Sequence, residues 1–271
     1  MLSLLAERAA SAFSVPAEAA LNTVASLLLV YCCTSIPVLL WALKQYVTSR
    51  KQGARSSPQA TVRQSSTEEA LPSPEATQRL IKARRSCFPK DYTGETIDRS
   101  IVEQLLDAAN WAPTHGRTEP WKFVVLGRTG QEEMFDLTLK VLQRECSPEV
   151  LRKKRAKLEG KRVKDYPKVP YMVMICMRRQ ALPEKVMPEW EEMCAVSSAV
   201  QNLWLAATAH GIAGYWSSWQ AEARDSQDMK DFLGLGPEDK CLGVFLLGKC
   251  FDLTVCRSTR RPLSEKVDWR L

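Results

Sequence analysis

The chain has 271 residues, of which 45% are hydrophobic and 25% charged, and its formal net charge is +7. This composition is that of a globular protein with enough apolar residues for a sizeable core, so neither metals nor disulfides are needed to hold it together. The chain has only two histidines, which argues against a histidine-based metal site. It has no zinc-finger spacing and no basic stripe interleaved with aromatic residues, which argues against nucleic-acid binding.

The nine cysteines are scattered along the chain and form no CxxC pair. An odd number of cysteines without framework spacing is typical of reduced thiols in a reducing compartment. We therefore expect free cysteines and no disulfide scaffold.

An uncharged stretch of 25 residues, Ala19–Leu43, follows an N-terminal tail of 18 residues. As a helix it is long enough to cross a hydrocarbon core of ~30 Å. It lacks the short apolar core and leading positive charge of a cleaved secretory signal, and the arginine richness of a mitochondrial presequence. We expect a single-pass membrane anchor at residues 19–43, with a buried or processed segment as the alternative.

Basic residues follow this stretch, beginning at Lys44 and including Arg50 and Lys51, and the first acidic residue after it is Glu68. The positive-inside rule then leaves the C-terminal part of the chain on the cytoplasmic side. Residues 44–73 are rich in Ser, Thr, Gln, Arg and Pro, and cannot bury enough surface to offset their ordering entropy, so they predict a flexible linker.

Residues 74–271 predict one domain in which helices alternate with a few strands. Ser73 and Pro74 can begin the first helix, and Pro113 ends the second, which starts after Thr96. The further elements are a strand at Trp121–Leu126, a helix near Gln131–Arg144, a strand at Pro170–Met177, a helix at Glu189–His210, a short strand or loop at Gly211–Trp219, a helix at Arg224–Leu233, a strand at Cys241–Gly248 and an extended basic tail from Phe251. The lack of a regular βαβ rhythm indicates an α+β fold.

Three clusters place polar residues where a core alone would not need them. The first is Arg84-Arg85-Ser86 at the end of the first helix, where the fork donors suit phosphate. The alternative is charge that complements the helix dipole.

The second cluster is the loop between the second helix and the first strand. Two prolines fix its path, Trp111 and Trp121 can flank a planar group, and the polar residues are His115, Arg117 and Glu119. A few polar groups in an aromatic-lined cleft are typical of a small-molecule site, although a rigid turn with exposed polar residues explains them too.

The third cluster is HGIAGYWSSW, His210–Trp219, in which glycines allow close backbone approach and Ser217 and Ser218 can donate hydrogen bonds. The chain contains no G-x-S-x-G, no GxGxxG and no Walker loop, which argues against a hydrolase, a Rossmann fold and a P-loop fold. The basic stretch Leu151–Lys168 is either a lid or a solvated helix face.

From about Ala76 to Trp269 the chain resembles the nitroreductase family of FMN-dependent oxidoreductases. Four blocks in order carry the resemblance: KARRSCFPKD, AANWAPTHGRTEPWKFVVL, the long helix with GYWSSW, and CLGVFLLGK with RRPLSEKVDW. The likeness is greatest to the compact bacterial branch of NAD(P)H nitroreductases. The TEPW sequence and the expected anchor also resemble the iodotyrosine deiodinase branch, but the acidic, tyrosine and lysine residues of that branch's lid have no match that we can place.

The resemblance implies a three-layer α+β fold, with a mixed, mostly antiparallel sheet between helices, in a domain-swapped homodimer with FMN at the subunit interface. It implies that Arg84, Arg85 and Ser86 bind FMN, with Trp111 and His115 beside the ring or phosphate. Trp216, Ser217 and Ser218 would contact the ring from the other subunit, and Arg260 or Arg261 would complete the phosphate site. Phe88 stands where family members often carry a further basic residue.

The implied activity is transfer of hydride from NADH or NADPH, through FMN, to an electron-poor small aromatic acceptor such as a nitroaromatic or a quinone, both bound in turn in one slot. The flavin would carry the chemistry, so the resemblance implies no catalytic side chain and no metal. The alternatives are a membrane-anchored reductive dehalogenase of the iodotyrosine deiodinase type and a non-enzymatic flavin-binding module.

Overall fold

The computed structural model describes residues 71–180, 183–252, 256 and 258–271. The predicted N-terminal tail, the membrane anchor at 19–43 and the linker up to residue 70 lie outside the described residues. No helix within the described ranges is long and apolar enough to cross a membrane. The domain that follows is the compact unit Leu71–Leu271.

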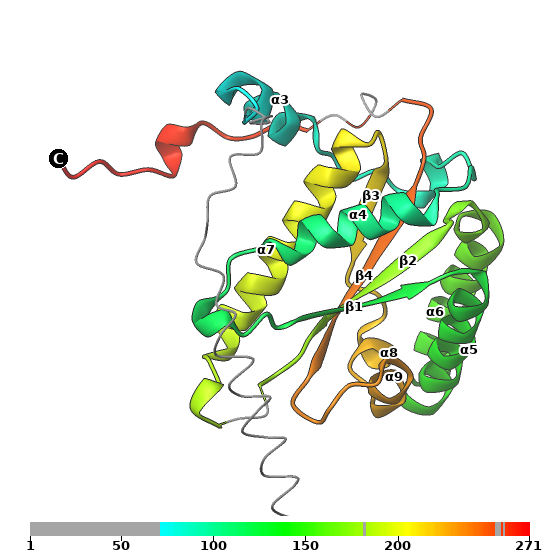
Figure 1. Ribbon diagram of the computed structural model, residues 1–271. Helices are drawn as coiled ribbons and strands as arrows, with labels where there is room; N and C mark the ends of the chain where they lie inside the picture. Colours follow the sequence, from blue (N-terminus) through cyan, green and yellow to red (C-terminus); the bar gives the residue numbers. More distant parts are fainter. Residues whose placement is uncertain (1–70, 181–182, 253–255, 257) are drawn as a thin grey trace, which may run out of the picture. The chain divides into compact units, whose positions relative to one another are not determined.

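A four-stranded sheet with the order β1-β2-β4-β3 is the centre of this domain (Figure 1). All three strand pairs are antiparallel, and one isolated parallel bridge joins Ser86 to Gly214 at the β3 edge. The strands predicted from apolar runs, β1, β2 and β4, are confirmed to within one residue. β3 lies in the segment that was expected as a short strand or a loop. The strands are β1 (Trp121–Leu126), β2 (Tyr171–Met177), β3 (Ala213–Ser217) and β4 (Lys240–Gly248).

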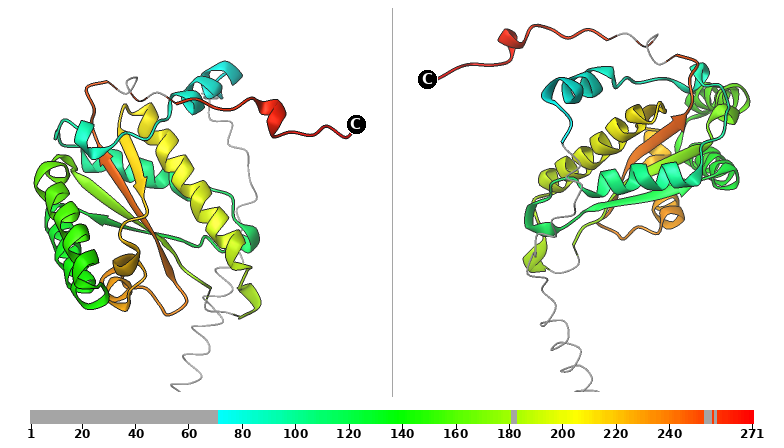
Figure 2. Two further views of the ribbon diagram at one scale, coloured as in Figure 1. Left: turned by 180° about the vertical axis from the view of Figure 1, so that it is seen from behind. Right: turned by 45° about the horizontal axis from the view of Figure 1, so that its top comes forward.

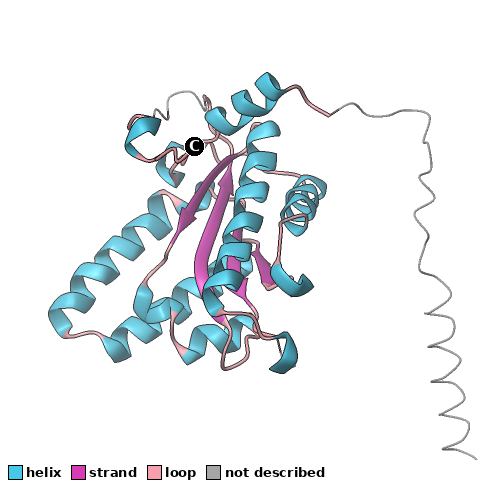
Figure 3. Ribbon diagram, turned by 90° about the vertical axis from the view of Figure 1, so that its left-hand side faces the viewer, coloured by secondary structure: helices cyan, strands magenta, loops and turns pink. Residues whose placement is uncertain are grey.

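Six of the seven α-helices of the described part cover the two faces of this sheet, so the predicted three-layer α+β fold is confirmed (Figures 2 and 3). One face packs against α4 and α7, and the other against α5, α6, α8 and α9. The helices are α3 (Pro74–Ala83), α4 (Arg99–Asn110), α5 (Arg128–Glu145), α6 (Pro148–Lys164), α7 (Glu189–Ala209), α8 (Ala221–Arg224) and α9 (Gln227–Leu233).

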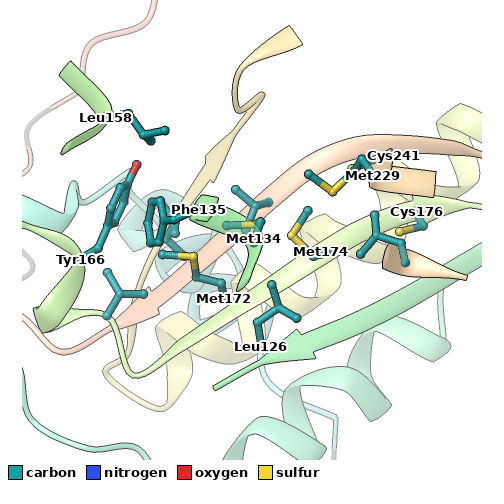
Figure 4. Packing of buried hydrophobic residues seen from close by; sticks show 14 of the residues in the cluster. Leu126, Met134, Phe135, Leu158, Tyr166, Met172, Met174, Cys176, Met229 and Cys241 are labelled. Atoms are coloured by element: carbon teal, nitrogen blue, oxygen red, sulfur yellow. The ribbon is translucent and has the colours of Figure 1, made fainter. Parts of the chain in front are cut away.

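The core has a different character on each face. Under α4 and α7, small and branched side chains such as Ala109, Val196 and Ala199 let the helices lie close to the sheet. Under α5, larger and more adaptable side chains fill the space, among them Phe135 and Met172 (Figure 4). The α4–α7 face therefore holds two closely packed helices, directly below the segments that carry the candidate site.

Helix starts follow the capping chemistry of the sequence. Ser73 Oγ accepts a hydrogen bond from the backbone N–H of Ala76 at 3.2 Å, and Pro74 occupies the first turn of α3. The single helix predicted at Arg224–Leu233 is wrong, because two short helices, α8 and α9, occupy this region. Ser226 Oγ accepts from the N–H of Met229 at 3.1 Å and so begins α9 as a new helix.

The described cysteines are all free thiols, which confirms the expectation of no disulfide scaffold for this part of the chain. The C-terminal segment after β4 returns over the end of the sheet toward α3 (Figure 1). This path brings residues near position 260 back to the Arg84 segment.

Candidate functional site

Two cavities lie along the exposed side of α7. Residues of α7 that are three or four positions apart line them: Glu191, Cys194 and Ser198 the first, and Gln201 the second. Residues at this spacing share one helix face, and the rise of ~1.5 Å per residue gives this face a length of about 15 Å. The sequence carries this signal in the spacing of small and polar residues on the predicted long helix, but those residues were not among the predicted site residues.

The second cavity, of about 490 Å³, holds a group of arginines. Arg84 and Arg85 come from the end of α3, and Arg260 comes from the returning C-terminal segment. The remaining lining residues are Ile81, Lys82, Gln201 and Ser258. None of these described lining residues is acidic, and we call Arg84, Arg85 and Arg260 the arginine cluster.

The positive charges of the arginine cluster are not balanced by an acidic residue among those that line the cavity. Burial lowers the pKa of the Arg84 guanidinium, and the like charges of Arg260 and Arg85 lower that pKa further. Arg84 also lies over the ring of Trp204, with 4.5 Å between its guanidinium carbon and the ring centroid. Positive charges held together without a carboxylate suit a phosphate group, which accepts several charge-assisted hydrogen bonds.

The two arginines of the signature differ in their contacts. Arg85 donates to the backbone carbonyl oxygens of Lys82 and of Arg84, the latter at 2.8 Å, so part of its role is to complete the end of α3. The indole N–H of Trp204 donates to the carbonyl oxygen of Arg85 at 3.2 Å. Trp204 therefore positions both arginines, a role that no local motif of the sequence reveals.

Ser86 lies at the open edge of the sheet. It forms the parallel bridge to Gly214, and the next backbone N–H, of Cys87, donates to the Gly214 carbonyl at 3.1 Å. The side chain of Ser86 is exposed. The signature segment is therefore fixed along β3 with its hydroxyl free to meet a ligand.

The first cavity, of about 420 Å³, is formed by the predicted loop and the first turns of α7. His115 Nδ1 and Glu191 Oε2 are 2.6 Å apart in a hydrogen bond. Trp190, 64% exposed, is another lining residue. The loop is thus joined to α7 through the histidine that the sequence singled out.

The two tryptophans of the loop do not have equivalent positions. Trp111 follows α4 and is 80% exposed. Trp121 packs against the α4–α7 core and donates its indole N–H to Asn110 Oδ1 at 3.0 Å. Trp111 is therefore the tryptophan available to a ligand or partner, and Trp121 holds the loop to β1.

Backbone strain marks the same segments. Three non-glycine residues of the described part have positive φ: Arg117 (55°), Glu119 (44°) and Trp219 (59°). Such conformations cost about 1–3 kcal/mol each and gather at functional sites. Two lie in the loop and the third directly follows Ser218, so both candidate segments carry strain. No ion pair joins Arg117 to Glu119 in the described structure, so the loop is not held by pairing of these two.

Trp216, Ser217 and Ser218 lie at the far end of β3. The indole N–H of Trp216 donates to the carbonyl of Leu242 at 3.1 Å. Ser217 Oγ accepts from the N–H of Trp219 at 3.2 Å, and Ser218 is exposed. A Cβ on Gly243 would lie 2.3 Å from the Ser217 carbonyl oxygen, so glycine there permits the close approach of β4.

One protomer therefore assembles the predicted residues only in part. Arg84, Arg85 and Arg260 share one cavity, whereas His115 lines another. Arg261 does not line the arginine cavity and forms an ion pair with Glu265 at 3.7 Å. Sequence proximity predicted the first two arginines, and the path of the chain brings Arg260, and not Arg261, into the cavity with them.

We next compared the chain with protein families and with curated proteins. Residues 81–249 match the description of the nitroreductase family. Among curated proteins, "Putative NAD(P)H nitroreductase YfhC" of Bacillus subtilis is 26% identical over 140 residues, which cover 51% of this chain and 67% of the relative. The 5,6-dimethylbenzimidazole synthase of Rhodospirillum rubrum is 29% identical over 134 residues, covering 48% of this chain and 63% of that enzyme.

Solved structures establish the same fold. A nitroreductase-like family protein from Bacillus cereus aligns with a TM-score of 0.59 and 22% identity, over 74% of this chain and 99% of that protein. The FMN-dependent nitroreductase NfnB from Mycobacterium smegmatis, solved with NADPH, aligns with a TM-score of 0.56 and 18% identity, over 73% of this chain and 99% of that enzyme.

Proposed function

The chain belongs to the nitroreductase family, and from this premise we propose that it is an FMN-dependent oxidoreductase. It takes hydride from NAD(P)H and reduces an electron-poor aromatic acceptor such as a nitroaromatic or a quinone. The observation that carries the proposal is the arginine cluster, a group of cations that lacks a described carboxylate and lies beside the signature serine. FMN, when bound, supplies the ring that accepts and returns the hydride.

The residues of the arginine cluster would hold the FMN phosphate. Arg84 is held against Trp204, so its guanidinium is already in position and little side-chain entropy is lost on binding. Arg260 is exposed and comes from a separate segment, so it can close on the phosphate from the other side. The exposed hydroxyl of Ser86 adds a neutral donor at the sheet edge.

A homodimer would complete the site. Trp111 and Trp190 are large apolar side chains left exposed on the α4–α7 side of the domain. A second copy packed there would cover them and would bring the His115 loop of one chain to the arginine cluster of the other. This arrangement accounts for the separation of His115 from Arg84 within one protomer.

NAD(P)H and the acceptor would use one slot in turn, so that the oxidised nucleotide leaves before the acceptor enters. The chain's own residues bind and orient in this scheme, and none needs to form a covalent bond to substrate. The strained loop at Arg117 and Glu119 is the segment best able to set the shape of the slot, because its backbone is held in a demanding conformation.

The membrane position is a separate proposal that rests on the sequence. Residues 19–43 would anchor the chain, and the basic residues after them would keep the domain on the cytoplasmic side. Retention of the full chain in carbonate-washed membranes would support the anchor. In sealed right-side-out vesicles, whose cytoplasmic face is inside, release of the domain by added protease only after the vesicles are opened would support the orientation. Loss of the chain to the wash would contradict the anchor.

The test of the activity is an absorbance spectrum of the purified protein before and after NADH or NADPH is added without oxygen. We expect a yellow protein whose flavin bands bleach with at least one nucleotide and return when a quinone is added. A colourless, correctly folded protein that does not take up FMN would refute FMN dependence. A yellow protein that neither nucleotide reduces would instead favour the flavin-binding module or the deiodinase-type enzyme, which dithionite-driven turnover of iodotyrosine separates.

A further inference from the structure

A third cavity, of about 370 Å³, opens on the face of the sheet opposite α7, and we call it the aromatic pocket. Its lining residues Tyr166 and Leu246 belong to the core beneath α5 and α6. It shares no lining residue with the two cavities along α7. Its lining is therefore separate from the arginine cluster and from the cavity at His115. The other residues that line it are Phe88, Pro89, Lys90, Lys161, Asp165 and Tyr215.

Aromatic rings form the walls of the aromatic pocket. Phe88 is 46% exposed and contacts Tyr215, with 4.6 Å between the ring centroids. Across the pocket, the ring of Tyr166 packs beside that of Phe135 at 5.0 Å (Figure 4). An exposed phenylalanine above a cavity loses water contact when a flat apolar ligand enters, which favours binding.

The frame of the pocket is fixed by hydrogen bonds to backbone carbonyls. Arg128 donates to the carbonyl oxygens of Tyr166 at 3.3 Å and of Pro167 at 2.8 Å. Lys168 Nζ donates to the carbonyl oxygen of Lys90 at 3.1 Å. The Lys168 contact holds the segment after α6 against the segment after the arginine signature, and the Arg128 contacts hold it against the start of α5, so the walls are preformed and a ligand need not order them.

The polar groups at the pocket are two lysines, one aspartate and two phenols, those of Tyr166 and Tyr215. Lys90 and Lys161 are exposed and form no ion pair within the described ranges, and with Asp165 they give a net charge of +1. Burial, with Asp165 and Tyr215 adding to its effect, raises the pKa of the Tyr166 hydroxyl. This hydroxyl therefore keeps its proton at neutral pH and can donate a hydrogen bond.

We propose that the aromatic pocket is a second small-molecule site, which takes a planar aromatic monoanion such as an aryl carboxylate. The ring of the ligand lies between Phe88 and Tyr166, and its carboxylate meets Lys161 and Lys90 at the rim. Asp165 disfavours a second negative charge, so a phosphate dianion binds the arginine cluster instead. The volume of the pocket holds a single substituted ring and is at the lower end of the range for small-molecule sites.

The probe for this site is 4-fluorobenzoate, followed by fluorine NMR with the FMN-loaded full chain. We expect binding that is about tenfold weaker for the neutral isostere 4-fluorobenzamide and for the Lys161→Gln variant, because each loses a charge-assisted hydrogen bond. The control is Lys157→Gln, which removes an exposed lysine of the same helix that does not line the pocket. Binding to this control should equal that of the wild type.

Two further variants distinguish binding in the aromatic pocket from binding at the arginine cluster. Phe88→Ala should weaken the probe severalfold, and Arg84→Gln should leave probe binding unchanged. Equal binding to Lys161→Gln and Lys157→Gln, or loss of binding in Arg84→Gln alone, would overturn the proposal, since the probe would then bind elsewhere. Both lysine changes are on the surface of α6, so folding of the variants does not limit the test.

Discussion

Helix α6 and the arginine cluster are both rich in positive charge, yet their surroundings differ. Four of the eight cations of α6 have carboxylate partners in the described structure: Lys153, for example, is 2.8 Å from Glu149, and Arg162 reaches Asp136 of α5 at 2.7 Å. The arginine cluster has no acidic residue among its described lining residues. The number of charges therefore does not identify an anion site, whereas several cations that line one cavity without an acidic residue do.

The same comparison bears on whether the basic stretch Leu151–Lys168 is a lid or a solvated helix face. Apart from the buried Leu158, α6 carries polar residues on most of its surface, and it pairs with α5 and α8 through its charges. This arrangement is the solvated helix face that charge runs usually form, and it gives no sign of a lid over the arginine cluster.

A cation paired with a buried carboxylate extends the comparison, and its substitution should have the largest effect on the free energy of unfolding. Arg179 is paired with Glu192, whose side chain is only 1% exposed. Arg179→Met should lower the free energy of unfolding by about 3–5 kcal/mol, because it leaves a buried carboxylate without its partner. Urea unfolding followed by circular dichroism measures this loss.

The double variant Arg179→Met/Glu192→Leu is the control for that experiment. It removes both charges, so it should recover most of the lost stability. A double variant no more stable than the single one would mean that the damage comes from repacking and not from the uncompensated charge.

The next largest effect is a loss of FMN affinity, expected on substitution within the arginine cluster. Arg84→Gln should weaken FMN binding about 10- to 100-fold, which corresponds to the ~1.5–3 kcal/mol of a hydrogen bond to a charged group. The free energy of unfolding of the FMN-free protein should stay the same or rise, because the change relieves repulsion from Arg85 and Arg260. Flavin fluorescence titration of the FMN-free protein measures the affinity.

Arg162→Gln is the matched control, because it removes an equally basic side chain that already has carboxylate partners. It should leave FMN affinity unchanged. If both variants weakened FMN to the same degree, general attraction by the +7 chain would explain the binding and the comparison between the two regions would fail.

The elements of the fold could be predicted where a local signal defines them. Apolar runs predicted β1, β2 and β4, the β3 segment was left open between a short strand and a loop, and Ser73 with Pro74 predicted the start of α3. The break between α8 and α9 was missed because no glycine or proline marks it, and the Ser226 cap that begins α9 is a single hydrogen bond. Local capping competed with periodicity there and prevailed.

The candidate site could be predicted only as separate pieces. Arg84 and Arg85 are neighbours in sequence, but the approach of Arg260 depends on how the chain returns after β4. The contact of His115 with Glu191 joins residues 76 positions apart. No periodicity or motif encodes such distances, so the sequence could name these residues but could not say which of them share a cavity.

A smaller effect, dependent on pH, is expected where α6 meets α8. The hydrogen bond from Lys154 is the main cause that lowers the pKa of Glu222 below its ordinary value of 4.5. The pair therefore stabilises the fold above about pH 4.5, and this contribution is lost as the pH falls through the lowered pKa. Glu222→Gln should cost about 1 kcal/mol or less at pH 7.

Urea unfolding of both proteins at pH 7 and at acid pH tests the sign of this effect. The difference in unfolding free energy between wild type and Glu222→Gln should shrink as the pH falls below 4.5. A difference that grows toward acid pH would show that the carboxyl of Glu222 is not stabilised in its charged form.

The smallest effect is expected for an exposed pair within α6 itself. Lys153 and Glu149 are 2.8 Å apart with side chains 72% and 69% exposed, so water screens their attraction. Lys153→Gln should change the free energy of unfolding by no more than ~0.5 kcal/mol and should leave FMN affinity unchanged. A loss of FMN binding in this variant, measured by the same fluorescence titration, would place α6 at the flavin after all. An unchanged affinity, beside the loss expected for Arg84→Gln, would support the arginine cluster as the FMN site and argue against a part for α6 in FMN binding.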